Sequence, residues 1–135
     1  MTKSKSSKII ITTDAKYLRD ESSPENYRFL WSYDIVITNN SDELIQLLNR
    51  YWRITDMRGK TEDVRGPGVV GLQPLIKPGK QFVYTSFCQL PTPQGTMEGN
   101  YEMQNLEEKR FLADIPKFVL ICPSSAENEF RAHLH

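Results

Sequence analysis

The stretch YRFLWSYDIVIT, residues 27–38, determines the fold class that we expect for this chain. Large apolar side chains occupy every second position of the stretch and alternate with mostly polar ones. The apolar set is Tyr27, Phe29, Trp31, Tyr33, Ile35 and Ile37. A period of two over this length is typical of a β-strand that turns one face to a core. Leu30 and Val36 indicate that the opposite face is not fully solvated.

Further strand-like segments flank this stretch, and turn residues separate them about every 8–12 positions. The segments are residues 8–17, 45–56, 61–65, 72–76, 82–88, 97–104 and 110–121. Pro116 predicts a bulge or an edge position in the last of them. No window of the chain has the apolar stripe of an amphipathic helix. The pattern predicts an all-β fold, an antiparallel β-sandwich of about seven strands in two sheets.

The shared parity of large side chains along separate strands predicts which residues form the core. We expect these to be mostly buried: Trp31, Ile35, Trp52, Ile54, Phe82, Tyr84 and Tyr101. The length of 135 residues fits one domain. We expect a flexible N-terminus over residues 1–7, the sandwich domain over 8–122 and a polar tail over 123–135.

Charge and hydropathy exclude several classes of partner. The 17 Lys and Arg residues balance the 17 Asp and Glu residues, so no overall field attracts nucleic acid or an anionic membrane. No segment is apolar over a length that a signal peptide or a membrane span needs. We therefore expect a cytoplasmic protein that binds neither nucleic acid nor membrane, as a monomer or a weak homodimer.

The residues that usually perform catalysis are sparse. The two histidines, His133 and His135, both lie in the polar tail, so no core residue can act as the base of a Ser-His or Cys-His site. Cys88 and Cys122 lie in strand-like sequence and are expected to be buried and reduced. We expect no enzyme activity and no cofactor.

Three acidic residues, Asp56, Glu62 and Asp63, fall near one expected hairpin. Carboxylates of this kind can bind a hard cation such as magnesium. Their spacing matches no known calcium loop, and charged hairpin ends are usually solvated. We expect no metal site.

A glycine motif, VRGPGVVGLQP over residues 64–74, has the spacing G-x-G-x-x-G of a pyrophosphate loop. Such a loop must open a helix, and Pro74 prevents one here. The glycines are therefore interpreted as backbone devices, which take a positive φ or allow close packing. The alternative is a small-anion or phosphate site formed by Arg65, Gly66, Gly68 and Gly71, whose amides would form a concave nest.

The middle of the chain resembles the ApaG family of small bacterial proteins. The matching pieces are RYWRITD (50–56), Gly59, VRGPGVVGLQP (64–74), Pro78-Gly79, FVYTS (82–86), LPTP (90–93) and MEGNYEM (97–103). The resemblance extends more weakly over about residues 8–122. Many relatives place histidine where this chain has Tyr51, so no metal or proton role is transferred to that position.

The resemblance implies a sandwich like those of fibronectin type III or immunoglobulin domains. The family is associated with cobalt and magnesium resistance or efflux, and similar domains occur in F-box proteins and in a polymerase-delta-interacting protein. This implies a non-catalytic module that binds an unidentified protein partner.

Overall fold

The alternating segment forms β3 (Phe29–Asn39), the middle strand of a three-stranded antiparallel sheet in this computed structural model. Its neighbours are β2 (Ile9–Tyr17) and β7 (Gln81–Leu90). The side chains of β3 alternate between buried and half-buried over its full length. Tyr27 departs from the prediction. It follows the short 3-10 turn Pro24–Asn26 with a φ of 56° and is exposed, so the alternation begins at Phe29.

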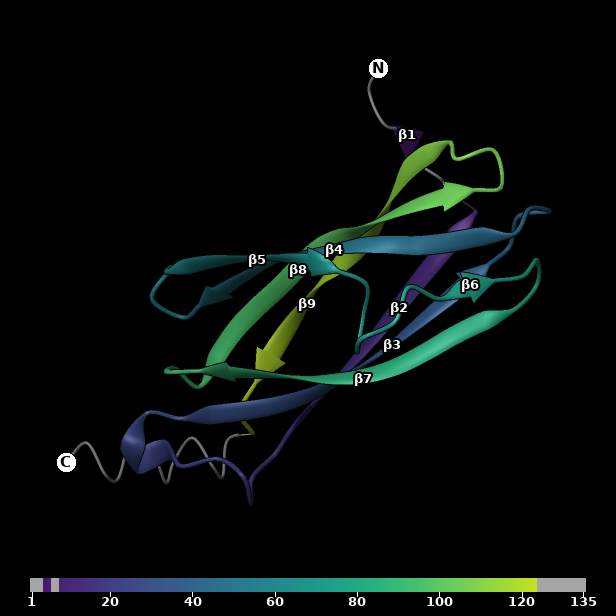
Figure 1. Ribbon diagram of the computed structural model, residues 1–135. Coiled ribbons are helices and arrows are strands. Elements are labelled where there is room, and N and C mark those ends of the chain that lie inside the picture. The colour runs from purple at the N-terminus through teal and green to yellow at the C-terminus, as the bar shows by residue number, and fades with distance from the viewer. Residues whose placement is uncertain (1–3, 6–7, 124–135) are drawn as a thin grey trace.

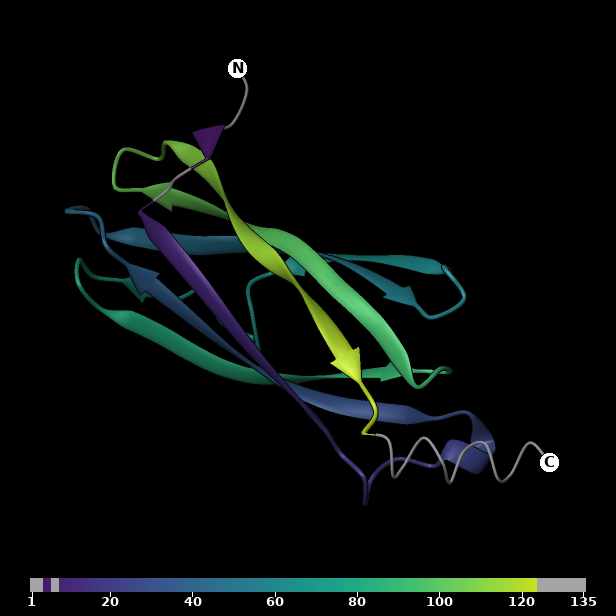
Figure 2. The same cartoon turned by 180° about the vertical axis from the view of Figure 1, so that it is seen from behind.

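The remaining strands form a second sheet with the order β1-β9-β8-β4-β5, in which β6 also pairs with β4. The strands are β1 (Ser4–Lys5), β4 (Ile45–Asp56), β5 (Thr61–Pro67), β6 (Leu75–Ile76), β8 (Gln94–Asn105) and β9 (Arg110–Ile121). All pairs are antiparallel except β1–β9. The two sheets face each other (Figures 1 and 2), and seven of the strands have seven or more residues. The predicted all-β antiparallel sandwich is confirmed.

The structure describes residues 4–5 and 8–123. Most of the predicted N-terminal segment and nearly all of the predicted tail lie outside them, as do His133 and His135. Within the first segment, Ser4 and Lys5 pair with Phe111 and Leu112 of β9.

Pro116 causes the irregularity that the sequence predicts. The β8–β9 register shifts between Met97, which faces Phe118, and Gly99, which faces Ile115. Two residues of β9, Pro116 and Lys117, therefore stand opposite a single residue of β8. This is a β-bulge, and it places the residue without an N–H group where the ladder is already interrupted.

An aromatic layer centred on Trp52 of β4 joins the sheets. Its ring meets Tyr33 of the opposite sheet edge-on, with centroids 5.5 Å apart, and contacts Phe118 at 5.9 Å and Tyr101 at 6.5 Å. Of the predicted core residues, Trp31, Ile35, Trp52, Tyr84 and Tyr101 are buried, whereas Ile54 and Phe82 are partly buried against the core.

Several ionisable side chains lie inside this core. The hydroxyl groups of Tyr84 (β7) and Tyr101 (β8) hydrogen-bond to each other across the two sheets, and burial raises the pKa of both. Burial also raises the pKa of the Cys88 thiol to about 11, with a smaller contribution from the charge of Glu62. Cys88 and Cys122 are both buried, as predicted.

These raised pKa values predict that stability falls in alkaline solution. The unfolded chain releases the Cys88 proton from its ordinary pKa of 9.0, whereas the folded chain keeps it to about 11. The stabilisation that the protonated Cys88 thiol gives the folded state is complete below pH 9. It is lost as the pH rises through the pKa that the thiol has in the folded chain. Urea unfolding should show a loss of about 1.4 kcal/mol per pH unit from this thiol, and the two phenols add to the loss above their own ordinary pKa.

The variant Cys88→Ala serves as the control for this prediction. Its unfolding free energy should change less steeply between pH 9 and pH 10 than that of the wild type, because one titrating group is removed. Equal slopes in the two proteins would contradict the assignment to Cys88.

Candidate functional site

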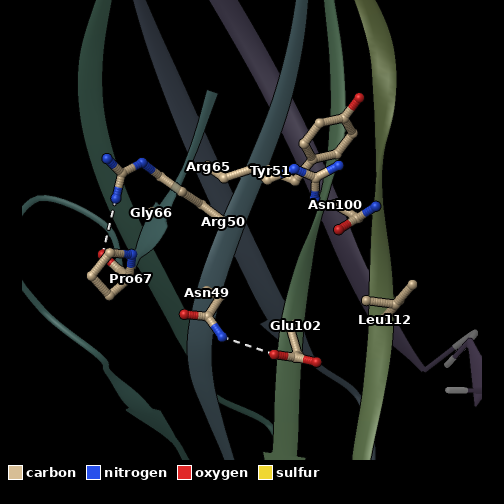
Figure 3. A pocket seen from close by; sticks show the side chains of 9 residues that line it. All are labelled: Asn49, Arg50, Tyr51, Arg65, Gly66, Pro67, Asn100, Glu102 and Leu112. Atoms are coloured by element: carbon tan, nitrogen blue, oxygen red, sulfur yellow. Dashed lines mark hydrogen bonds between the residues drawn. The ribbon is translucent and has the colours of Figure 1, made fainter. Parts of the chain in front are cut away.

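The outer face of the larger sheet carries polar side chains in rows across β5, β4, β8 and β9. One row consists of Arg65, Tyr51, Asn100 and Asp114, which are cross-strand neighbours in the register. Its first three residues border an open groove of about 500 Å³, together with the next row, which contains Asn49 and Glu102. Figure 3 labels the residues that line the groove. Both Arg65 and Gly66, two of the four predicted site residues, line this groove.

Tyr51 and Arg65 stack on each other in the groove. The guanidinium carbon of Arg65 lies 4.2 Å from the centroid of the Tyr51 ring, a cation–π contact (Figure 3). The Tyr51 hydroxyl donates to Asp63 Oδ1 at 3.0 Å, and Arg53 Nε donates to the same oxygen at 3.1 Å. Hydrogen bonds from Arg53 and then Tyr51 hold the pKa of Asp63 below its usual value. The ring that carries Arg65 is therefore fixed at its hydroxyl end.

Arg65 differs from the other arginines of this face. Arg53 pairs with Asp63, and Arg110 pairs with Glu102 at 3.3 Å. Within residues 4–5 and 8–123, Arg65 forms neither a salt bridge nor a hydrogen bond through its side chain. Its N–H groups are thus available to a ligand at the border of the groove.

The end of the groove away from Arg65 contains an acidic side chain, Glu102, and an apolar one, Leu112. Glu102 accepts a hydrogen bond from Asn49 Nδ2 at 2.8 Å, drawn in Figure 3, and lies opposite Leu112 of β9. The groove therefore presents a cation beside an aromatic ring at one end, whereas at the other end the buried carboxylate of Glu102 is already paired with Asn49 and Arg110. Such a surface can bind a polar ligand of mixed character.

Gly66 provides space for a second arginine. Arg50 of β4 stands opposite both Gly66 and buried Tyr101, and its Nη1 donates to the carbonyls of Pro67 at 2.9 Å and Gly68 at 3.1 Å. A Cβ at Gly66 would lie 2.9 Å from this guanidinium group. Gly66 thus lets Arg50 fasten the chain that leaves β5.

Gly68 and Gly71 serve the backbone of the following loop, at φ values of 63° and 80°. Val69 and Leu72 exchange both of their backbone hydrogen bonds across a two-residue turn, in which Val70 also has a positive φ, of 45°. This is the type I′ arrangement of a tight hairpin. The interpretation of these glycines as backbone devices is confirmed at these two positions.

The same loop uses amides that an anion nest would need. The N–H of Gly68 donates to the Leu48 carbonyl at 2.8 Å, and the N–H groups of Val69 and Leu72 donate to each other's carbonyls. No helix follows the loop within the described residues. Anion binding by Arg65, Gly66, Gly68 and Gly71 stays a prediction, and of these residues Arg65 has the suitable donors.

The acids near the first hairpin do not converge on a cation. Asp56 Oδ1 accepts from the amides of Arg58 at 2.9 Å and Lys60 at 3.0 Å, and so fixes the turn, while Asp63 pairs with Arg53. Among the described residues, no group of three or more His, Cys, Asp or Glu side chains is arranged to hold a metal ion. The described part of the chain also has no helix long and apolar enough to cross a membrane.

Sequence reasoning missed Arg50, the Tyr51–Arg65 pair and the groove beside them. The chain holds only a partial signal for the pair. Symmetric pairing about the expected turn, residues 57–60, places Tyr51 opposite Gly66, one residue from its observed partner Arg65. The role of Arg50 has no comparable signal, because it depends on where the loop after β5 crosses β4.

The comparisons with known proteins agree with the fold. The model of the ApaG domain matches residues 19–105. The chain belongs to the ApaG family. It is 48% identical over 115 residues to Protein ApaG of Agrobacterium fabrum and 50% identical over 115 residues to that of Brucella anthropi, and each match covers 85% of this chain and 88% of the relative.

A solved structure of an ApaG relative has the same fold. The crystal structure of the putative ApaA protein from Bordetella pertussis superposes with a TM-score of 0.83 at 38% identity, over 85% of this chain and 94% of that one. The recognition made from the glycine loop and its flanking strands is therefore confirmed.

The loop geometry predicts different costs for two glycine substitutions. A Cβ at Gly68 would lie 2.1 Å from the Leu72 carbonyl oxygen, whereas one at Gly71 meets open space. Gly71→Ala should reduce the unfolding free energy by about 1–2 kcal/mol through its positive φ. Gly68→Ala adds a steric clash and should cost roughly 2–5 kcal/mol. Chemical denaturation measures both, and equal losses would contradict the packing described.

The same variants test the anion alternative. Millimolar ATP, GTP, NAD or pyrophosphate should shift the melting temperature no more than matched ionic strength does. A saturable shift that Gly71→Ala abolishes in a folded protein would establish the alternative instead.

Proposed function

We propose that this protein is a non-catalytic β-sandwich module that binds a protein partner through the outer face around Arg65. The observation that carries the proposal is the guanidinium group of Arg65, stacked on Tyr51 beside an open groove. Arginine and tyrosine are enriched among the residues that dominate binding energy. A guanidinium already held on a ring loses less conformational entropy on binding. A carboxylate of the partner is the matching group, because it accepts two parallel hydrogen bonds from arginine.

The surroundings of the groove support this role. A second hollow of about 320 Å³ shares Tyr51 and Asn100 with the first. Lys117 and Glu98 pair at 3.7 Å beside it, and Arg53 pairs with Asp63. A polar, ion-paired rim around a few anchoring side chains is the usual anatomy of a protein interface.

The distribution of reactive groups supports a non-catalytic role. The chain has no histidine between residues 1 and 132. Burial raises the pKa of the Cys88 thiol, which is the opposite of what activates a nucleophile. Ser86 is the cross-strand neighbour of buried Tyr33, so its side chain lies on the core-facing side of β7.

The association of ApaG proteins with cobalt and magnesium resistance fits an indirect role. We place the link to divalent cations in the partner, because the acids of the first hairpin already bind backbone amides or Arg53. The occurrence of similar domains inside F-box proteins supports a binding module. Cys88 and Cys122 form no disulfide with each other, which fits the cytoplasm, where we place the protein.

Affinity capture from the native cell with the intact chain tests the proposal. Replacing a dominant interface residue with alanine weakens binding by about 2 kcal/mol or more, close to thirtyfold in the dissociation constant. Arg65→Ala should therefore lose the captured partner, and Tyr51→Ala should do so as well because it removes the ring. Tyr51→Phe keeps the ring and should retain binding.

Arg58→Ala is the matched control. Arg58 is an exposed arginine in the β4–β5 turn, outside the groove, and its side chain makes no hydrogen bond or salt bridge within the described residues. Circular dichroism confirms that each variant is folded. A partner that binds wild type and Arg65→Ala with equal affinity would refute the assignment of this face.

A further inference from the structure

The strand β7 is an edge of the three-stranded sheet, since β3 is its only paired neighbour among the described strands. Figure 1 shows it along one margin of the sandwich, whereas β2, at the other edge of its sheet, lies against β9 (Figure 2). An edge strand presents unpaired N–H and C=O groups along one side. A ten-residue edge strand is therefore a template for another strand.

β7 lacks the features with which proteins usually protect an edge. Charged side chains and proline prevent edge-to-edge pairing. The sequence of β7, QFVYTSFCQL, contains neither. By contrast, the edge strand β5 carries three charged residues and a proline, in the sequence TEDVRGP.

The solvent-facing residues of β7 are apolar at two positions. Val83 is 57% exposed and Phe87 is 62% exposed. The exposed residues of the strand, in order, are Gln81, Val83, Thr85, Phe87 and Gln89. This order is nearly the same in both directions, with glutamine at each end, an apolar side chain next to it and threonine at the centre.

We propose that β7 pairs with β7 of a second copy of this chain, antiparallel and about a two-fold axis at Thr85. In that register Val83 of one copy faces Phe87 of the other, twice, and each Gln81 faces Gln89. Pairs of an aromatic and a β-branched side chain are favourable across strands. Each pair joins two residues whose side chains point to the outer face of their own sheet. The two three-stranded sheets therefore continue as one six-stranded sheet with matching faces.

Electrostatics permit this pairing. The nearest acid on the outer face is Asp34, which accepts a hydrogen bond from the Thr85 hydroxyl. In the dimer the two copies of Asp34 would lie three strand spacings apart, about 14 Å. That distance exceeds the Debye length of about 8 Å at physiological salt. A single strand pair is a small interface, so the dimer is weak and reversible.

Sedimentation of the intact chain tests the proposal over about 10 µM to 1 mM, the range in which a weak dimer dissociates. The wild type should pass from monomer to dimer. Thr85→Lys places two like charges on the axis and should raise the dissociation constant about fivefold or more. Thr12→Lys is the matched control: Thr12 is an exposed threonine on the outer face of the same sheet, in β2 at the opposite edge. It should dimerise like the wild type.

A charge exchange tests the register. Val83→Lys and Phe87→Glu should each weaken the dimer. The double variant brings the introduced ammonium of one copy opposite the introduced carboxylate of the other, so it should dimerise more tightly than either single variant. All these side chains are exposed, so each variant should fold. Thermal melts check that each protein is folded.

Three results would overturn the proposal. These are a wild type that stays monomeric at the highest concentration, a Thr85→Lys variant that dimerises like wild type, and a double variant no tighter than the single ones. If the wild type stays monomeric and Thr85→Lys loses binding to a partner protein, the edge pairs with a strand of that other protein instead. Arg65→Ala leaves this edge unchanged, so the test is independent of the proposed partner site.

Discussion

The contact of Trp52 with Tyr33 is the interaction on which the sandwich depends, because it joins β4 of one sheet to β3 of the other. Trp52 also meets Tyr101 and Phe118, so the indole contacts aromatic rings from three strands. Edge-to-face pairs of this kind add to the free energy of burying the rings. A shift of one residue in the register of β4 would move Trp52 to the solvent face and lose all three contacts. The aromatic layer therefore fixes the registers as well as the packing.

The phenols of Tyr84 and Tyr101 bring a requirement for hydrogen bonds into the core between the sheets. Tyr84 and Tyr101 meet this requirement with each other across the sheets. A buried hydroxyl without a partner would cost roughly 1–3 kcal/mol, so the pair favours one arrangement of the two sheets. The same environment raises the pKa of the phenols and of Cys88 and so suppresses their ionisation.

The alternation along β4 connects this core to the groove. Arg50 and Trp52 share one side of the strand, and Tyr51 and Arg53 share the other. Arg50 fixes the carbonyls at the end of β5, which carries Arg65, while Tyr51 supports the Arg65 guanidinium group. Arg50, on the core-facing side of β4, thus holds β5 in place, and β5 carries Arg65, the proposed contact residue, on its outer side. The groove face is charged and ion-paired, whereas the edge at β7 is uncharged. The two surfaces can therefore bind different partners.

The sequence by itself determined the long strands, because a period of two and turn residues are local properties. It missed β1, and of the expected strand 72–76 only Leu75–Ile76 is a strand. It predicted β3 apart from its first residues, both ends of β4 and β9, and the bulge at Pro116. It also predicted the ApaG family. The tertiary structure decided which strands lie side by side. Local pattern specifies the face that a residue occupies but not its neighbouring strand. For that reason the position of β7 at an edge and the reach of Arg50 over Gly66 became visible only in the folded chain.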